Sequence, residues 1–231
     1  MVTLPSPRRA IEWALFFTIA AVPGCWDGRQ MRHDEPPAGA VVGVVQRVDD
    51  GDTVTLRDGR RVRYVGIDTP ESGEPFNKLA TAENRRLVGG KKIECRQSGP
   101  DATDRYGRYL GIVKVVHATE LAERNVNAAL VRAGLASVYI AAADSLGEGD
   151  LATLLEAQHE ALRGRRGFWK ERLFRVAQLR EPLVATRFRI HLKSCEEVRS
   201  HRTLPIQLVE AELQAGKSFC KRCQPSGKTH E

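Results

Sequence analysis

Two carboxylates and an arginine stand close together in residues 63–71, which have the sequence RYVGIDTPE. The first five residues predict a strand. The Asp-Thr-Pro that follows suits a turn, because proline fixes φ and a short polar side chain can bond the local backbone. A turn requires neither Glu71 nor Arg63. These two residues, together with Asp68, are therefore candidates for chemistry.

A third carboxylate lies upstream, in the sequence DDGDTV at 49–54. If the strands around this turn pair as a meander, Asp52 and Asp68 lie at neighbouring strand ends. Two carboxylates and a backbone carbonyl suit a hard divalent cation that prefers oxygen ligands, such as Ca²⁺. Waters and a substrate phosphate would complete the coordination shell, as a catalytic metal requires.

Arginine supplies the complementary charge. Hydrolysis of a phosphodiester puts negative charge on the phosphorus centre, and guanidinium groups stabilise this charge bidentately. Arg63 is one candidate, and Arg108 in the sequence TDRYGRYL is the second. Glu71 would orient or deprotonate the attacking water. Each residue taken alone fits a solvated turn or a surface salt bridge, but the combination favours phosphodiester chemistry.

The elements that must position these residues begin with three strands within 40–67, separated by turns at 49–51 and 58–59. Further strands are expected at 91–97 and 109–117, with the polar loop 98–108 between them. Cys95 falls in one of these strands as a core thiol. Three helices are expected, within 74–90, 124–140 and 150–163.

The helices have recognisable faces and ends. Phe76, Leu79, Ala80 and Leu87 are expected to share the buried face of the first helix. Asn125 or Asn127 would cap the second helix, and Gly134 would end it. The order of elements predicts a mainly β fold with helices (α+β), in which a five-stranded barrel of the OB type packs with three helices.

Five motifs together resemble the thermonuclease (staphylococcal nuclease) family, in the family's order. They are DDGDTV, RYVGIDTPE, TDRYGRYLG, NAALVRAGLASV and EAQHEALRGRRGFW, and they extend over roughly residues 40 to 170. The resemblance implies an OB-fold domain, placed at 40–172, and a Ca²⁺-dependent phosphodiesterase acting on DNA and RNA. A monomer is expected.

The resemblance also implies roles for individual residues. Asp52 and Asp68 match the calcium carboxylates, and Thr69 would offer its backbone carbonyl. Glu71 matches the general base or water-orienting residue, and Arg63 and Arg108 match the phosphate clamps. Arg105 and Tyr106 match residues that touch the terminal phosphate of the substrate. The tyrosine pair of the family is absent after Val138, where Tyr139 is a substitute for one of them.

The tail holds a second set of candidate ligands, which are His191, Cys195, Cys220 and Cys223. Three cysteines and one histidine, two of them in a Cys-x-x-Cys knuckle, have the chemistry of a structural zinc site. A redox pair or disulfide between Cys220 and Cys223 is the alternative. The segment resembles small Ada-type metal-binding modules, and a module at 185–225 is expected. His201 is a spare candidate.

The N-terminus predicts export. Arg8 and Arg9 precede the apolar sequence AIEWALFFTIAAV, which has the length of a signal peptide. A buried helix is the alternative. Residues 1–25 are assigned to the signal and 26–39 to a linker. VPGC at 22–25 resembles a lipobox, which would anchor Cys25 to a membrane through lipid, but ordinary cleavage remains open. The protein is thus expected to be secreted or to lie in the cell envelope.

The net charge of the 231 residues is +7, which favours polyanionic partners such as nucleic acid. The basic residues of the tail would add a second surface for nucleic acid. The alternative to a nuclease is a protein of a different class, an envelope protein that binds nucleic acid without hydrolysing it. The nuclease is preferred over it, because the acidic and arginine positions are all filled.

Overall fold

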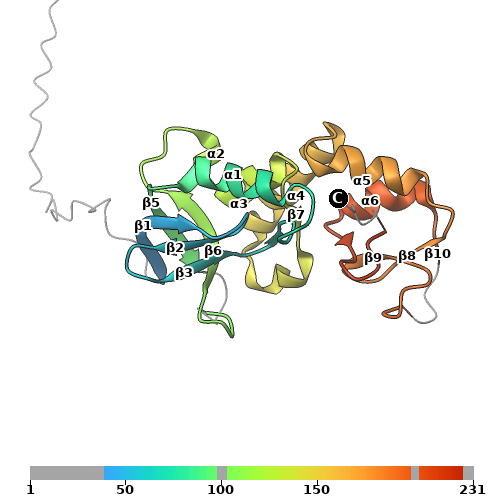
Figure 1. Ribbon diagram of the computed structural model, residues 1–231, viewed down its shortest axis with the longest axis horizontal. Coiled ribbons are helices and arrows are strands. Elements are labelled where there is room, and N and C mark those ends of the chain that lie inside the picture. Colours follow the sequence, from blue (N-terminus) through green and yellow to red (C-terminus); the bar gives the residue numbers. More distant parts are fainter. Residues whose placement is uncertain (1–38, 98–102, 199–202, 226–231) are drawn as a thin grey trace, which may run out of the picture. The chain divides into compact units, whose positions relative to one another are not determined.

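The computed structural model describes residues 39–97, 103–198 and 203–225 (Figure 1). The expected export signal over 1–25, nearly all of the linker 26–39 and His201 lie outside these residues. Residues 36–231 form one compact unit. Within the described part of the chain, no helix is long and apolar enough to cross a membrane.

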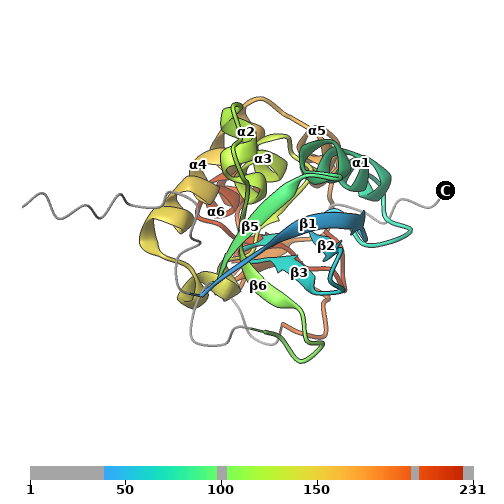
Figure 2. The same ribbon diagram turned by 90° about the vertical axis from the view of Figure 1, so that its left-hand side faces the viewer.

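Five strands close into a barrel in the order β1-β2-β3-β6-β5, as the sequence predicts (Figures 1 and 2). Only β3 and β6 pair in parallel; the other neighbours are antiparallel. Alternating apolar side chains fill the interior, and Cys95 is fully buried among them, as expected. The strands are β1 (Ala40–Val48), β2 (Thr53–Leu56), β3 (Arg61–Tyr64), β5 (Lys92–Gln97) and β6 (Tyr109–Val115).

The three expected helices are present as α1 (Asn77–Val88), α3 (Val126–Arg132) and α4 (Glu148–Arg163). The Asn125 side chain caps α3 by accepting from the Ala128 amide at 3.0 Å. Beyond the end of this helix, Gly134 takes a left-handed conformation (φ 70°) that other residues rarely adopt.

One helix face and two helices differ from the expectation. Leu79 is 57% exposed, so its assignment to the buried face of α1 was wrong. The helix turns Ala80, Asn84, Leu87 and Val88 inward instead. The additional helices are α2 (Leu121–Arg124) and α5 (Phe168–Ala177).

The C-terminal strands form a second sheet, in the order β10-β8-β9-β11. Its apolar side chains share one core with α4 and α5, in which Trp169 and Leu162 pack with Ile190, Leu213 and Phe219. This part of the chain therefore packs on the two helices that follow the barrel. Its elements are β8 (Leu183–Ala185), β9 (Arg189–Leu192), β10 (Thr203–Leu204), α6 (Val209–Gln214) and β11 (Ser218–Phe219).

Candidate active site

One arginine bridges the two carboxylates that the sequence places at neighbouring strand ends. Asp68 ends β4 (Ile67–Asp68), which pairs with β7 (Ser137–Val138) beside the barrel. The Arg63 guanidinium contacts Asp52 through Nη1 and lies 3.7 Å from Asp68 Oδ1 through Nη2. The meander thus brings both acids to one guanidinium, as the pairing of the strands predicts.

Asp52 is held firmly, with 4% of its surface exposed. Its Oδ2 accepts from the Thr69 amide at 3.1 Å and from Thr69 Oγ1 at 2.8 Å. Burial raises the pKa of Asp52 above its ordinary value, and Arg63 and the Thr69 hydrogen bond offset part of this rise. The two segments that carry the acids are therefore joined directly.

A buried asparagine of α1 fixes the turn before Asp52. Asn84 accepts from Tyr64 Oη at 2.9 Å and donates from Nδ2 to the Asp50 carbonyl at 3.0 Å. Gly51 completes the turn, because a Cβ atom there would lie 2.8 Å from the Thr69 side chain. Asn84 was not among the site residues predicted from the sequence.

Glu71 and Asp68 share a lysine from the distant end of the chain. Lys221 Nζ donates to Asp68 Oδ1 at 2.9 Å and to Glu71 Oε1 at 2.7 Å. The Glu71 side chain remains 68% exposed, so water can reach it. The Glu74 carboxylate accepts from the Glu71 amide at 2.9 Å and so helps to fix this loop. Lys221 was missed in the sequence because it lies inside the Cys-x-x-Cys knuckle.

Arg108 stands next to this group but binds a different acid. It lies two residues before Leu110, which pairs with Arg63 across β3 and β6. Its Nη2 is 2.7 Å from Asp104, in the loop that precedes β6. Among the described residues, it has no ion pair with Asp52, Asp68 or Glu71.

Two other residues implied by the family resemblance lie in the same loop as Arg108. Tyr106 is 62% exposed, and the Arg105 and Arg108 guanidinium groups lie 4.8 and 5.4 Å from its ring centre. Arg105 also donates to Tyr106 Oη at 2.7 Å. Together these side chains present two cations around one exposed ring.

Tyr139 follows β7 and contacts the C-terminal sheet. Its ring lies 5.4 Å from the Arg189 guanidinium of β9, and its amide donates to the Gly66 carbonyl at 2.9 Å. Tyr139 thus has a cation beside its ring that comes from the C-terminal sheet.

The acidic group fits a calcium ion by the chemistry of its donors. Asp52 and Asp68 supply carboxylate oxygens, the ligands that Ca²⁺ prefers, and an ion bound there would share these acids with Arg63 and Lys221. Thr69 adjoins both acids through its hydrogen bonds to Asp52 and its bond to Asp68 in the chain. The carbonyl of Thr69 is the third oxygen that such an ion would use.

The tail brings its four candidate ligands together. The ligand atoms of His191, Cys195, Cys220 and Cys223 all lie within 4.8 Å of one another. In a tetrahedral site, ligands about 2.0–2.3 Å from the zinc lie about 3.3–3.8 Å apart, so the four side chains would close slightly around an ion. The four described cysteines are free thiols, and Thr186 Oγ1 lies 3.4 Å from His191 Nε2.

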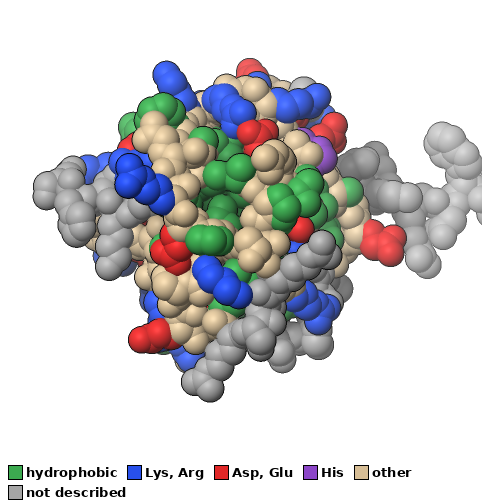
Figure 3. Space-filling model, turned by 90° about the vertical axis from the view of Figure 1, so that its right-hand side faces the viewer, with side chains coloured by type: hydrophobic (Ala, Val, Ile, Leu, Met, Phe, Trp, Pro, Cys, Tyr) green, Lys and Arg blue, Asp and Glu red, His purple; other side chains and the backbone are tan. Residues whose placement is uncertain are grey.

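The basic side chains of the tail are largely matched by acids. Lys217 contacts Glu212, Arg222 contacts Glu196 and Glu197, and Lys221 contacts the candidate site. Figure 3 shows Lys and Arg side chains spread among apolar and uncharged ones on this face. Of the basic residues expected to form the second surface, Lys217, Lys221 and Arg222 thus have acidic partners, and Arg199 and Arg202 lie outside the described residues.

Comparisons with known proteins agree with this geometry. The family profile described as "Staphylococcal nuclease homologue" matches residues 61–171. An "Uncharacterized endonuclease" of Escherichia coli O157:H7 is 36% identical over 132 residues, which are 56% of this chain and 77% of that protein. A "Micrococcal nuclease" of Shigella flexneri is 34% identical over 137 residues, 56% of this chain and 74% of that protein. A "Thermonuclease" of Staphylococcus intermedius is 31% identical over 102 residues, 40% of this chain and 56% of that protein. The chain belongs to the family of staphylococcal nuclease homologues.

Proposed function

We propose that this nuclease-family hydrolase is a Ca²⁺-dependent phosphodiesterase that hydrolyses DNA and RNA. The observation that carries the proposal is the single guanidinium of Arg63 between Asp52 and Asp68, with Glu71 three residues further along the chain. Membership of the family and the names of its relatives support action on nucleic acid.

Glu71 accepts a proton from water as the water oxygen bonds to phosphorus. The exposed position of its side chain gives it access to solvent, and Glu74 holds its backbone in place. The bond from phosphorus to the 5′ oxygen breaks, and that oxygen takes up a proton from solvent. The products are a 3′-phosphate and a 5′-hydroxyl, as the family resemblance implies.

The two arginines stabilise the charge that builds up on the phosphate oxygens. Arg63 is one-fifth exposed and already faces the acids, so a phosphate bound beside Asp68 lies within its reach. Arg108 reaches the same phosphate when it leaves Asp104, while Arg105 and Tyr106 hold the terminal phosphate. Asp52, Asp68 and the Thr69 carbonyl would hold Ca²⁺, which supplies further positive charge to the reacting phosphate.

The tail would hold one structural Zn²⁺ through His191, Cys195, Cys220 and Cys223. The Thr186 hydroxyl lies beside His191 Nε2 and would help to orient the imidazole. All four ligands come from the protein, so this site has no open position for chemistry.

One assay tests the proposed activity directly. The purified protein is incubated with single-stranded DNA and with RNA, first in Ca²⁺ and then in excess EGTA, and the ends of the products are identified. Cleavage that depends on Ca²⁺ and leaves 3′-phosphates is expected. Full activity in EGTA, or products with only 5′-phosphates, would refute the assignment.

We also propose that the protein is exported, either secreted or held in the envelope through lipid on Cys25. The short apolar segment after Arg8-Arg9 and the VPGC sequence support this proposal. Cell fractionation of the wild type and of Cys25→Ser tests it. Loss of membrane association in the variant would support the lipid anchor, and full-length protein in the cytosol would contradict export.

A further inference from the structure

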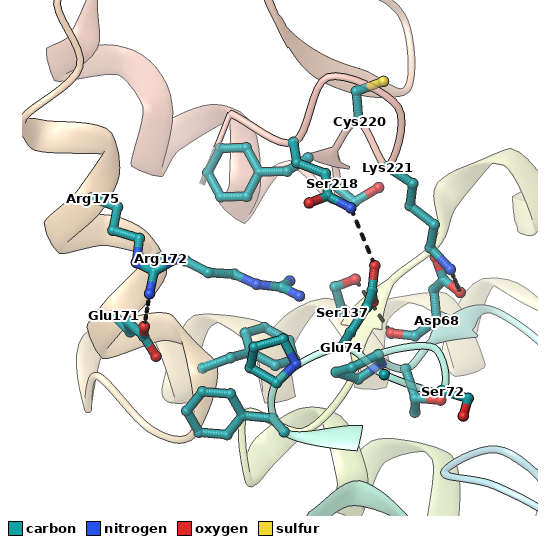
Figure 4. A pocket seen from close by; sticks show the side chains of 18 residues that line it. Asp68, Ser72, Glu74, Ser137, Glu171, Arg172, Arg175, Ser218, Cys220 and Lys221 are labelled. Atoms are coloured by element: carbon teal, nitrogen blue, oxygen red, sulfur yellow. Dashed lines mark hydrogen bonds and ion pairs between the residues drawn. The ribbon is translucent and has the colours of Figure 1, made fainter. Parts of the chain in front are cut away.

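A pocket of about 340 Å³ opens beside the candidate active site (Figure 4). Asp68 and Thr69 form one end of it, next to the proposed calcium position. The loop 70–76, helix α5 and the residues from β11 to the knuckle form the other walls. A substrate strand bound at the calcium site therefore passes the mouth of this pocket.

Arg172 points from α5 into the middle of the pocket (Figure 4). Its neighbour Arg175 pairs with Glu171, whereas Arg172 has no hydrogen bond or ion pair with any described residue. Its guanidinium lies over the Phe168 ring at 3.8 Å. Burial lowers the pKa of Arg172 to about 10, and Glu74 and Asp68 offset part of this effect. Arg172 is half-buried, so its donors face the pocket, where a ligand with hydrogen-bond acceptors can replace the water that they contact.

The rest of the lining narrows the chemistry of that ligand. The half-buried Phe76 forms an apolar wall; it meets Phe168 edge to face at 6.3 Å, and Phe168 itself is buried beneath the Arg172 guanidinium. Glu74 and Asp68 add acceptors, and the three acids and three basic residues that line the pocket balance in charge, so it has no excess positive charge to favour a phosphate. A purely apolar ligand would leave Arg172 without partners. A flat heteroaromatic ring that carries both donors and acceptors satisfies all of these walls, and a nucleobase is such a ring.

We propose that this pocket binds the nucleobase next to the phosphate that is cleaved, and that Arg172 determines which base is preferred there. The inference rests on the proposed nuclease function. The Arg172 fork donates to acceptors on the base edge, and Glu74 accepts from an amino or ring N–H group of the same base. The C-terminal part of the chain thus takes part in substrate selection through the wall that it supplies.

Mapping of cut sites tests this subsite. A pool of single-stranded oligonucleotides with a randomised centre is cleaved in Ca²⁺, and the product ends are sequenced. The wild type should show a preference on the order of tenfold for one base at a fixed position beside the cut, the scale of one good bidentate contact. Arg172→Ala should reduce this preference to below about twofold, with KM affected more than kcat.

Two further variants make the test specific. Arg172→Lys keeps the charge but loses the fork, so it should also lose the preference. Arg180→Ala removes an exposed arginine that follows α5, and this variant should retain the base preference of the wild type. Melting curves verify folding, and Arg172→Gln replaces the alanine variant if that variant fails to fold.

Each outcome bears on the inference. A wild type without base preference refutes it, as does a preference that survives in Arg172→Ala or returns fully in Arg172→Lys. A wild type that cuts none of the pool refutes the proposed nuclease function, and the subsite falls with it.

Discussion

Substitution of Glu71 should change the catalytic rate without changing the stability of the fold. Its side chain is 68% exposed and contacts Lys221, so Glu71→Gln should leave the melting temperature nearly unchanged. We expect kcat to fall about a hundredfold or more, because a positioned proton acceptor contributes on this scale. Steady-state kinetics on single-stranded DNA in Ca²⁺ measures the change.

A matched control removes the same charge elsewhere. Glu196 is 87% exposed, so Glu196→Gln should have wild-type kinetics. Arg63 is less suitable for this purpose, since it bridges Asp52 and Asp68 and its loss also disturbs both acids. Unchanged turnover in a folded Glu71→Gln variant would show that another group handles the proton.

Lys221 presents its charge to two acids of the candidate site, of which Asp68 is a proposed calcium ligand. An ammonium group on Asp68 competes with Ca²⁺ for the same oxygen and repels the ion. Lys221→Met should therefore lower the Ca²⁺ concentration for half-maximal activity about fivefold or more, since roughly 1 kcal/mol is the energy of two unit charges about 4 Å apart in water and the energy is larger near a protein surface. Calcium titration of the initial rate measures this shift.

The neighbouring Arg222 serves as the control for Lys221. It is 61% exposed and contacts Glu196 and Glu197, away from the site, so Arg222→Met should titrate like the wild type. A higher Ca²⁺ requirement in Lys221→Met would contradict the competition and indicate that the lysine assists substrate instead.

At the level of the elements, helix α1 supports the turn before Asp52 through the side-chain amide of Asn84. Asn84→Ala would leave the buried Tyr64 hydroxyl and the partly buried Asp50 carbonyl without this partner. Each loss costs about 1–3 kcal/mol, so thermal unfolding should move down by several degrees. Ca²⁺ affinity should fall as well, because the turn carries Asp52.

Arg85→Ala on the same helix is the control, since Arg85 is exposed. Its melting temperature and calcium response should match those of the wild type. An Asn84→Ala variant with wild-type values for both would show that α1 does not position the turn.

The sequence predicted the parts of the site that depend on local chemistry. Turn residues and β-branched segments predicted that Asp52 and Asp68 lie at neighbouring strand ends, and both acids do lie beside the Arg63 guanidinium. Asn84 was not predicted to be a buried site residue, because polar residues in helices usually face solvent. Its signal was the spacing: it lies four residues after Ala80 and three before Leu87, on the buried face.

Helix α5 could have been predicted from the sequence, whereas the role of Lys221 and the pocket could not. The α5 helix could have been found, because Trp169, Leu173 and Val176 recur at helical spacing on its buried face. Lys221 and the pocket could not, because their contacts join segments that are distant in sequence and follow no period. Only the packing of the tail against α5 brings them to the site.

For the molecule as a whole, the tail should carry one Zn²⁺ per chain. Elemental analysis of the purified full-length protein measures it, and Cys223→Ser should lose the metal. Cys95→Ala should keep it, because Cys95 lies in the barrel interior and not in the ligand cluster. Removal of zinc should also lower the melting temperature, since the tail shares its core with α4 and α5.

The zinc proposal also has clear contrary results. A wild-type protein without stoichiometric zinc would contradict it, and so would a Cys220–Cys223 disulfide found by mass spectrometry of the unreduced protein. Zinc retained in Cys223→Ser would show that the metal is held by other residues.

The order in which the chain is synthesised decides when the contacts of Lys221 can form. This lysine is 153 positions from Asp68 and 150 from Glu71. Because a ribosome delivers the chain from its N-terminus, the barrel and both acids emerge well before the lysine that neutralises them. A nascent or prematurely ended chain would therefore display these carboxylates without their lysine. The segment that carries Lys221 thus sets the final charge of a site whose two acids were made well before it.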